Sequence, residues 1–174
     1  LRSRGLGDVY KRQALRHGIE HCNGKYIIMG DADDSYNFLE LSLFIERLQA
    51  GYDMVMGNRF AGGITKGAMP WLHRYVGNPF LSSLGRFLFK NNIGDFHCGL
   101  RAFTKKCYNI INPQCNGMEF ASELVALASI HQMRICEIPV ILYPDGRKRR
   151  PHLRSWRDGF RHMVLLYSLY LLRN

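Results

Sequence analysis

Short apolar runs alternate with longer stretches of helical periodicity along most of the chain. The short runs are typical of strands in the interior of a sheet. They lie at 25–30 (KYIIMG), 53–57 (DMVMG) and 134–143 (RICEIPVILY). Segment 94–103 (GDFHCGLRAF) is typical of a loop that leads into a short strand. Between them, apolar residues three or four positions apart predict helices at 37–50, 70–92 and 118–132. This order predicts an α/β fold, with a mostly parallel sheet flanked by helices.

The connections carry their own local signals. Asn37 is placed to cap the helix that follows it, with Glu40 three residues on as the partner of a capping box. Asp34 is assigned to the start of the same helix, where acidic residues are favoured. Segment 58–70 (NRFAGGITKGAMP) is rich in glycine and predicts a mobile loop.

The first 13 residues, LRSRGLGDVYKRQ, follow neither pattern. They have no apolar period, and DVYKRQ is what a sequencing-library adaptor end encodes when translated. We therefore predict that residues 1–13 are a non-native, adaptor-derived segment, and we exclude them from the fold. A natural N-terminal tail is the alternative.

The formal net charge of +10 is uneven along the chain. Residues 14–144 carry 12 basic and 11 acidic groups, whereas residues 145–174 carry eight basic and two acidic groups. The body is therefore nearly neutral, which argues against a general nucleic-acid-binding protein. The basic C-terminal part indicates contact with phosphate or with an anionic membrane surface.

Five cysteines are spaced irregularly and include no C-x-x-C pair. That pattern indicates reduced thiols and argues against a disulfide framework or a zinc site.

An acidic turn, Asp31-Ala32-Asp33-Asp34, follows the first predicted strand. In α/β sheets, ligands bind beyond the carboxyl ends of the strands. Two carboxylates two positions apart on extended backbone project to the same side and repel each other, unless a divalent cation lies between them. Mg²⁺ or Mn²⁺, completed by phosphate and water oxygens, would suit Asp31 and Asp33. From spacing alone, a solvated acidic turn explains them equally well.

Several motifs in chain order resemble those of one family. The chain carries I-x-G-D-A-D, GNRF, HRYVGN, DFHCGLRAF, EIP and then a basic loop. Over residues 14 to about 162 this order resembles family-two glycosyltransferases of the GT-A fold, above all the polyprenyl-phosphate (dolichyl-phosphate) sugar synthases. The resemblance implies a GT-A (Rossmann-like) fold, incomplete at the N-terminus, with a partial glycosyltransferase domain at 14–155.

The resemblance also implies site residues. Asp31 and Asp33 would hold Mg²⁺ or Mn²⁺ on the diphosphate of a nucleotide sugar, although Ser35 stands where the family often has a glutamine. Asp95 is the catalytic candidate: it would be the base if the acceptor is a hydroxyl, or would orient groups or counter Arg101 if the acceptor is an ionised lipid phosphate. The substrate-binding candidates are Arg59, Arg74, Arg101, Glu123, Arg147 and Lys148.

The C-terminal segment 156–174 predicts a strongly apolar helix with Arg157 and Arg161 near its start. Its uninterrupted apolar stretch, 163–172, is too short to cross a bilayer. We expect it to lie at a membrane interface or to begin a membrane span, with burial in the core as the alternative. The expected location is the cytoplasmic face of a membrane.

These observations together predict a glycosyltransferase that moves a sugar, with inversion, from a nucleoside-diphosphate donor to a polyprenyl phosphate. A saccharide hydroxyl as acceptor, a nucleic-acid-binding module and a catalytically dead membrane scaffold are the alternatives. Because the resemblance places the nucleotide-base site upstream of residue 14, we expect the 174 residues alone to turn over little.

Overall fold

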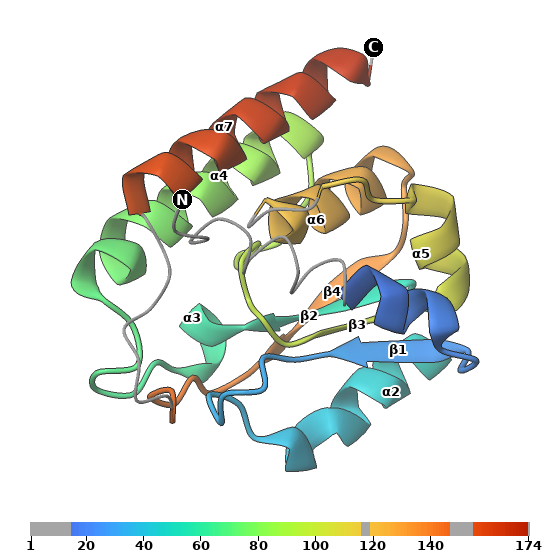
Figure 1. Cartoon of the computed structure of the whole chain (residues 1–174), viewed down its shortest axis with the longest axis horizontal. Helices are drawn as coiled ribbons and strands as arrows, with labels where there is room; N and C mark the ends of the chain where they lie inside the picture. Colours follow the sequence, from blue (N-terminus) through green and yellow to red (C-terminus); the bar gives the residue numbers. More distant parts are fainter. Residues whose placement is uncertain (1–14, 116–118, 147–154, 174) are drawn as a thin grey trace, which may run out of the picture.

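The computed structural model describes residues 15–115, 119–146 and 155–173. A four-stranded sheet lies at its centre, with helices on both faces (Figure 1). The strands are β1 (Tyr26–Met29), β2 (Met54–Asn58), β3 (Arg101–Thr104) and β4 (Ile135–Pro139), in the spatial order β1-β3-β2-β4.

The sheet is mixed. β1, β2 and β4 run in one direction, while β3 lies between β1 and β2 and is antiparallel to both. The predicted α/β class is confirmed, and three of the four strands share one direction as expected. The inserted β3 brings its first residues to the edge where β1, β2 and β4 end: Arg101 is paired with both Met29 and Met56.

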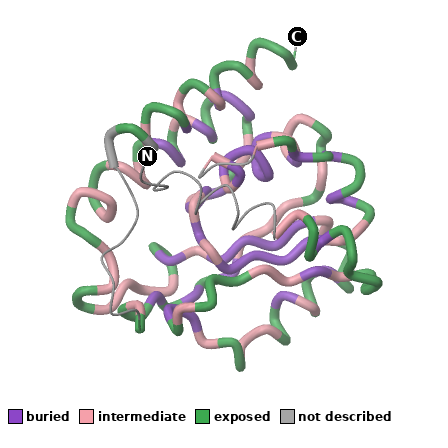
Figure 2. Tube along the Cα trace, in the orientation of Figure 1, coloured by how far each residue is buried: buried purple, intermediate pink, exposed green. Residues whose placement is uncertain are grey.

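Helices cover the two faces of the sheet as its alternating side chains require. Met54, Met56 and Phe103 face α5 (Lys105–Ile111) and α6 (Phe120–Ile130), whereas Val55 and Ala102 face the opposite side. On that side, Phe44 and Leu48 of α2 (Leu41–Gln49) cover the sheet. The buried residues concentrate along the central strands and on the inner faces of the helices (Figure 2).

A second layer of helices lies beyond α6. The π-helical turn η2 (His73–Gly77) leads into α4 (Asn78–Phe89), which packs beside α7 (Ser155–Leu172) (Figure 1). Leu88, Phe89, Ala126 and Leu166 form the buried contact between α4, α6 and α7. Within the described part of the chain, no helix is both long and apolar enough to cross a membrane.

Two details differ from the sequence predictions and one agrees with them. Segment 58–70 is more ordered than a mobile loop: it contains α3 (Arg59–Gly62), and Ile64 forms a parallel bridge with Leu142. Helix α5, which the periodicity did not indicate, follows β3 directly and is capped by Thr104, whose side chain accepts from Cys107 N. All five cysteines are free thiols, as predicted.

Asn37 caps the next helix as predicted, and Asp34 does not. The Asn37 side chain accepts from Leu39 N and opens a short 3₁₀ turn, η1 (Phe38–Glu40), which α2 continues. Glu40 accepts from the Asn37 side-chain amide. Asp34 instead adopts the left-handed conformation, with φ of 60°. The assignment of Asp34 to helix capping was therefore wrong.

Candidate active site

The acidic turn lies where β1 ends, at the edge shared by the ends of β2 and β4. Asp31 is exposed and Asp33 is half-buried. Asp33 Oδ1 accepts from both the backbone N–H and the hydroxyl of Ser35, at 3.2 Å and 2.5 Å. Gly146 N donates to Asp33 O at 2.8 Å, so the chain after β4 also fixes the turn.

Gly99, in the loop before β3, lies against the Asp31 carboxylate. A Cβ on Gly99 would stand 2.0 Å from Asp31 Oδ2, so only glycine leaves room for this arrangement. The same loop is tied to the acidic turn by Tyr36, whose hydroxyl accepts from Gly99 N at 3.1 Å. Burial raises the pKa of Tyr36 far above its ordinary value, so its phenol remains neutral.

Arg59, which follows β2, forms a buried ion pair with Asp95. Its Nε lies 2.7 Å from Asp95 Oδ2 and its second guanidinium nitrogen 2.8 Å from Oδ1, and its backbone N–H donates to Oδ2 at 3.1 Å. Asp95 is fully buried and Arg59 is 8% exposed. Burial opposes the charge on Arg59, but the hydrogen bonds and charge of Asp95 outweigh it and raise the pKa of Arg59. Bidentate pairs of this kind fix both groups in orientation.

The backbone around Asp95 is held by a second carboxylate. Glu137, in β4, accepts from Gly94 N and Asp95 N, each at 2.9 Å. Glu137 was not among the residues predicted from the sequence, although a charged residue inside an apolar strand indicates a buried partner. Tyr36 was missed because nothing in its local sequence indicates a partner 63 residues away.

Asp95 forms its ion pair with Arg59, while its charge also acts on Arg101. The Arg101 guanidinium donates to the carbonyls of Cys98 and Ala121, and the side chain is 1% exposed. Burial lowers the pKa of Arg101, with nearby acidic groups working in the opposite direction. Arg101 therefore ties the 95–99 loop to the start of α6. A direct contact of Arg101 with substrate stays a prediction.

The remaining predicted residues lie in three different settings. Arg74, in η2, is half-buried; it donates to Ile64 O at 3.4 Å and stacks over Tyr75. Glu123 is buried in α6 and accepts from Gln114 N and Cys115 N, so it holds the chain before α6, and its contact with substrate stays a prediction. Arg147 and Lys148 lie outside the described residues.

The donor set suits a hard divalent cation only with help from a substrate. Among the described residues, no three His, Cys, Asp or Glu side chains form a group that would hold a metal ion. Asp31 and Asp33 provide carboxylate oxygens, the ligands that Mg²⁺ and Mn²⁺ prefer. Phosphate and water oxygens would complete the shell, as the sequence predicts.

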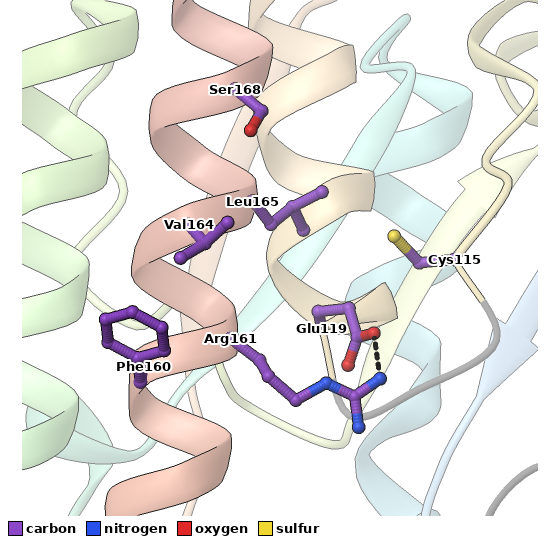
Figure 3. Close-up of a pocket in the computed structure, with 7 residues that line it drawn as sticks. All are labelled: Cys115, Glu119, Phe160, Arg161, Val164, Leu165 and Ser168. Carbon is purple, nitrogen blue, oxygen red and sulfur yellow. Dashed lines mark hydrogen bonds and ion pairs between the residues drawn. The ribbon is translucent and has the colours of Figure 1, made fainter.

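One apolar cleft lies away from these residues, between α7 and the chain just before α6. Its volume is about 360 Å³. Figure 3 shows Arg161 from α7 bonded to Glu119 across one end, at 2.7 Å. The walls are formed by Cys115, Phe160, Val164, Leu165 and Ser168. None of the predicted site residues lines this cleft.

Sequence comparison decides the family. Residues 7–110 match the sequence model of "Glycosyl transferase family 2". The chain belongs to the family-two glycosyltransferases. The resemblance read from the motifs is thereby confirmed. The match begins inside segment 1–13, which lies outside the described residues, so the adaptor origin of that segment stays a prediction.

Curated relatives of this glycosyltransferase include three with informative names. The "Low-salt glycan biosynthesis hexosyltransferase Agl6" of Haloferax volcanii is 37% identical over 86% of this chain and 36% of its own length. The "Dolichyl-phosphate hexose transferase" of the same organism is 32% identical over 66% of this chain and 48% of its own. The "Polyprenol monophosphomannose synthase" of Mycolicibacterium smegmatis is 29% identical over 78% and 51%.

Solved structures confirm the GT-A fold. Glucosyl-3-phosphoglycerate synthase from Mycobacterium tuberculosis, in complex with phosphoglyceric acid, superposes with a TM-score of 0.67 at 16% identity, covering 91% of this chain and 54% of that one. The same enzyme with Mn²⁺, uridine diphosphate and glucosyl-3-phosphoglycerate gives a TM-score of 0.66 at 15% identity, covering 90% and 53%. At such low identity the likeness concerns the fold alone.

Proposed function

We propose that this glycosyltransferase moves a sugar from a nucleoside-diphosphate donor to a polyprenyl phosphate. The observation that carries the proposal is the 95–99 loop, which joins an anionic and a cationic half of one site. At one end Gly99 lies against the Asp31 carboxylate, and at the other Asp95 holds Arg59. A reaction between two phosphate-bearing substrates needs both halves: a site for a cation at the donor diphosphate, and oriented guanidinium groups that can bind the acceptor phosphate.

The donor would lie at the acidic turn. Asp31 and Asp33 would hold Mg²⁺ or Mn²⁺, which neutralises charge on the leaving diphosphate when bound. Ser35 keeps one oxygen of Asp33 oriented, and Gly99 leaves room for the Asp31 carboxylate. The lipid phosphate oxygen then bonds to the anomeric carbon from the side opposite the diphosphate, whose bond to that carbon breaks, so the configuration inverts.

The acceptor phosphate would lie near Arg59 and Arg74. A lipid phosphate is largely ionised near neutral pH and needs no base to attack. Both Asp95 oxygens already accept from Arg59, which supports an orienting role for Asp95 and disfavours proton transfer. Arg147 and Lys148 stay predicted contacts to phosphate.

The names of the relatives support the class of acceptor. They include a dolichyl-phosphate, a polyprenol-monophosphate and an undecaprenyl-phosphate sugar enzyme. The chain spans 36% to 51% of the length of the curated relatives it matches. Activity, substrates and partners of the whole protein are therefore proposals.

The proposed location is the cytoplasmic face of a membrane, and one face of α7 supports it. Phe160, Val164, Tyr167 and Leu171 recur at helical spacing and are 63%, 49%, 59% and 55% exposed. A solvent-facing apolar stripe of this kind is typical of helices that lie in the membrane interface. Arg161, near the start of this helix, is paired with Glu119.

A radiolabelled transfer assay with the full-length protein tests the proposal. Nucleoside-diphosphate sugars are offered with polyprenyl phosphate and Mn²⁺, and the product is divided between organic solvent and water. The expected product is a labelled lipid that disappears in Asp33→Ala or without metal. A label recovered only in water-soluble saccharide would support the hydroxyl acceptor and overturn the proposed one.

A further inference from the structure

His97, Ser122 and His162 form a chain of hydrogen bonds behind the 95–99 loop, called here the His97 chain. Ser122 Oγ, in the first turn of α6, lies 3.0 Å from His97 Nε2 and 2.8 Å from His162 Nδ1. The two imidazole rings meet edge to face, with centroids 4.8 Å apart. Ser122 and His162 are 0% and 5% exposed, so this chain links three elements inside the molecule: the loop, α6 and α7.

The donor and acceptor of each hydrogen bond in the His97 chain follow from the number of protons available. A serine hydroxyl carries one proton, so it donates to one ring and accepts an N–H from the other. Nδ1 of His97 is buried and has no hydrogen-bond partner among the described residues. Because a buried N–H without an acceptor is costly, we assign the proton of His97 to Nε2. His97 then donates to Ser122, and Ser122 donates to His162.

The His97 chain ends next to the Arg59–Asp95 ion pair. His97 is two residues from Asp95, and its backbone N–H donates to Asp95 Oδ1 at 3.2 Å, the oxygen that also binds Arg59. A displacement of His97 that carries its backbone along would therefore move a donor of the carboxylate that orients Arg59. At the other end, His162 belongs to the helix that carries the exposed apolar stripe.

We propose that Ser122 and His162 are positioning residues. Through His97, they couple the packing position of α7 to the orientation of the Asp95–Arg59 pair. The proposal rests on the proposed function in so far as Arg59 receives the acceptor phosphate. Its structural part, the coupling of α7 to residues 95–99, stands apart from the identity of any substrate.

Hydrogen–deuterium exchange of the full-length protein tests the coupling. We compare Ser122→Ala and His162→Leu, which break the chain, with His162→Asn, whose amide can restore a polar contact where Nδ1 lies. Ser129→Ala is the matched control, because Ser129 lies on the same helix and accepts from Asn91 at 2.8 Å, outside the His97 chain. Losing a buried hydrogen bond should speed exchange of the 95–99 amides by roughly 5- to 30-fold. Amides of β2 should be unchanged, and His162→Asn should lie close to the wild type.

Kinetics give the second readout. In the transfer assay, Ser122→Ala and His162→Leu should lower kcat/KM for the acceptor, while the Mn²⁺ affinity and the KM for the donor stay unchanged. The double variant should lose no more kcat/KM than either single variant. Equal exchange in Ser122→Ala and Ser129→Ala, or additive losses in the double variant, would overturn the coupling. Absence of transfer by the wild type would count against the proposed function alone, since the exchange comparison still decides the coupling.

Discussion

Gly99 is the residue whose replacement should change the predicted metal site most directly. Its missing side chain makes room for Asp31, because a Cβ would stand 2.0 Å from Oδ2. We expect Gly99→Ala to push the Asp31 carboxylate aside and to weaken Mn²⁺ binding by at least about 10-fold, since a displaced carboxylate no longer shares the cation with Asp33. Electron paramagnetic resonance of free Mn²⁺ measures this directly.

Gly18→Ala provides the control for this change. Nothing lies within 4 Å of a Cβ at Gly18, so the same substitution there should leave Mn²⁺ affinity unchanged. An unaltered affinity in Gly99→Ala, with the variant folded, would mean that Asp31 does not take part in the metal site.

Asp95→Asn distinguishes an orienting group from a base. The amide keeps one oxygen acceptor for Arg59 but loses charge and the second acceptor. If Asp95 orients Arg59 for an ionised phosphate, we expect transfer to polyprenyl phosphate to fall by roughly 10-fold, whereas loss of a required general base costs about 10²–10⁴-fold. Initial rates on variants with intact thermal transitions measure the difference, because breaking a buried ion pair also destabilises the fold. A loss near the upper value would restore the base role.

At the scale of the elements, the sequence was informative wherever local pattern decides the structure. The apolar runs located β1, β2 and β4, and Asn37 located the start of the next helix. The antiparallel direction of β3 could not be predicted, because a strand of four residues between two neighbours carries no signal of orientation. The short helix α3 was missed since its glycines read as loop, although Asn58 caps it by accepting from Ala61 N.

The same limit applies to the site. Asp31, Asp33, Arg59 and Asp95 were recognisable as single residues from their motifs. The pairing of Arg59 with Asp95 spans 36 positions in the chain and the support from Glu137 spans 42, so both depend on which strands are neighbours. Arg101 illustrates this limit: its motif suggests a substrate contact, which stays a prediction, and gives no sign of its hydrogen bonds to two backbone carbonyls.

The junction of α6 and α7 should respond to acid through His97. Burial lowers the pKa of His97 well below its ordinary value, and the charges of His162, Arg59 and Arg101 act in the same direction. Since the unfolded chain binds this proton more readily than the folded one, stability is complete above about pH 6.5 and falls as the pH drops toward the folded pKa. Urea unfolding at several pH values should show a loss of up to about 1.4 kcal/mol per pH unit from this group.

His97→Gln should lose less stability than the wild type between pH 7 and pH 5, because the group that must stay neutral is gone. His131→Gln, at an exposed position on the turn after α6, serves as the control and should follow the wild type. Parallel pH profiles for the wild type and His97→Gln would show that His97 does not cause the acid response.

On the scale of the whole molecule, the charged site and the exposed apolar stripe lie on different elements. The strand ends carry the charged site, while α7 lies in the outer helical layer with its apolar stripe exposed. α2 covers the opposite side of the sheet, as Figure 1 shows. This arrangement suits an enzyme with a lipid acceptor, because α7 can contact the membrane without using the residues of the site at the strand ends.

The membrane contact is testable by removing apolar side chains from one side of the sheet at a time. Phe160→Ser with Tyr167→Ser should weaken binding of the 174-residue chain to anionic phospholipid vesicles by about 10²- to 10⁴-fold, because each large side chain buried in lipid contributes roughly 1.5–3 kcal/mol. Leu39→Ser with Leu43→Ser removes residues that are 91% and 45% exposed beside and on α2, and should leave binding unchanged. Vesicle flotation at two salt concentrations separates this apolar contribution from attraction of the basic residues to the headgroups, since only the latter weakens with salt. Equal losses in both double variants would show that exposed apolar residues bind lipid without preference for α7, and the proposed orientation on the membrane would be wrong.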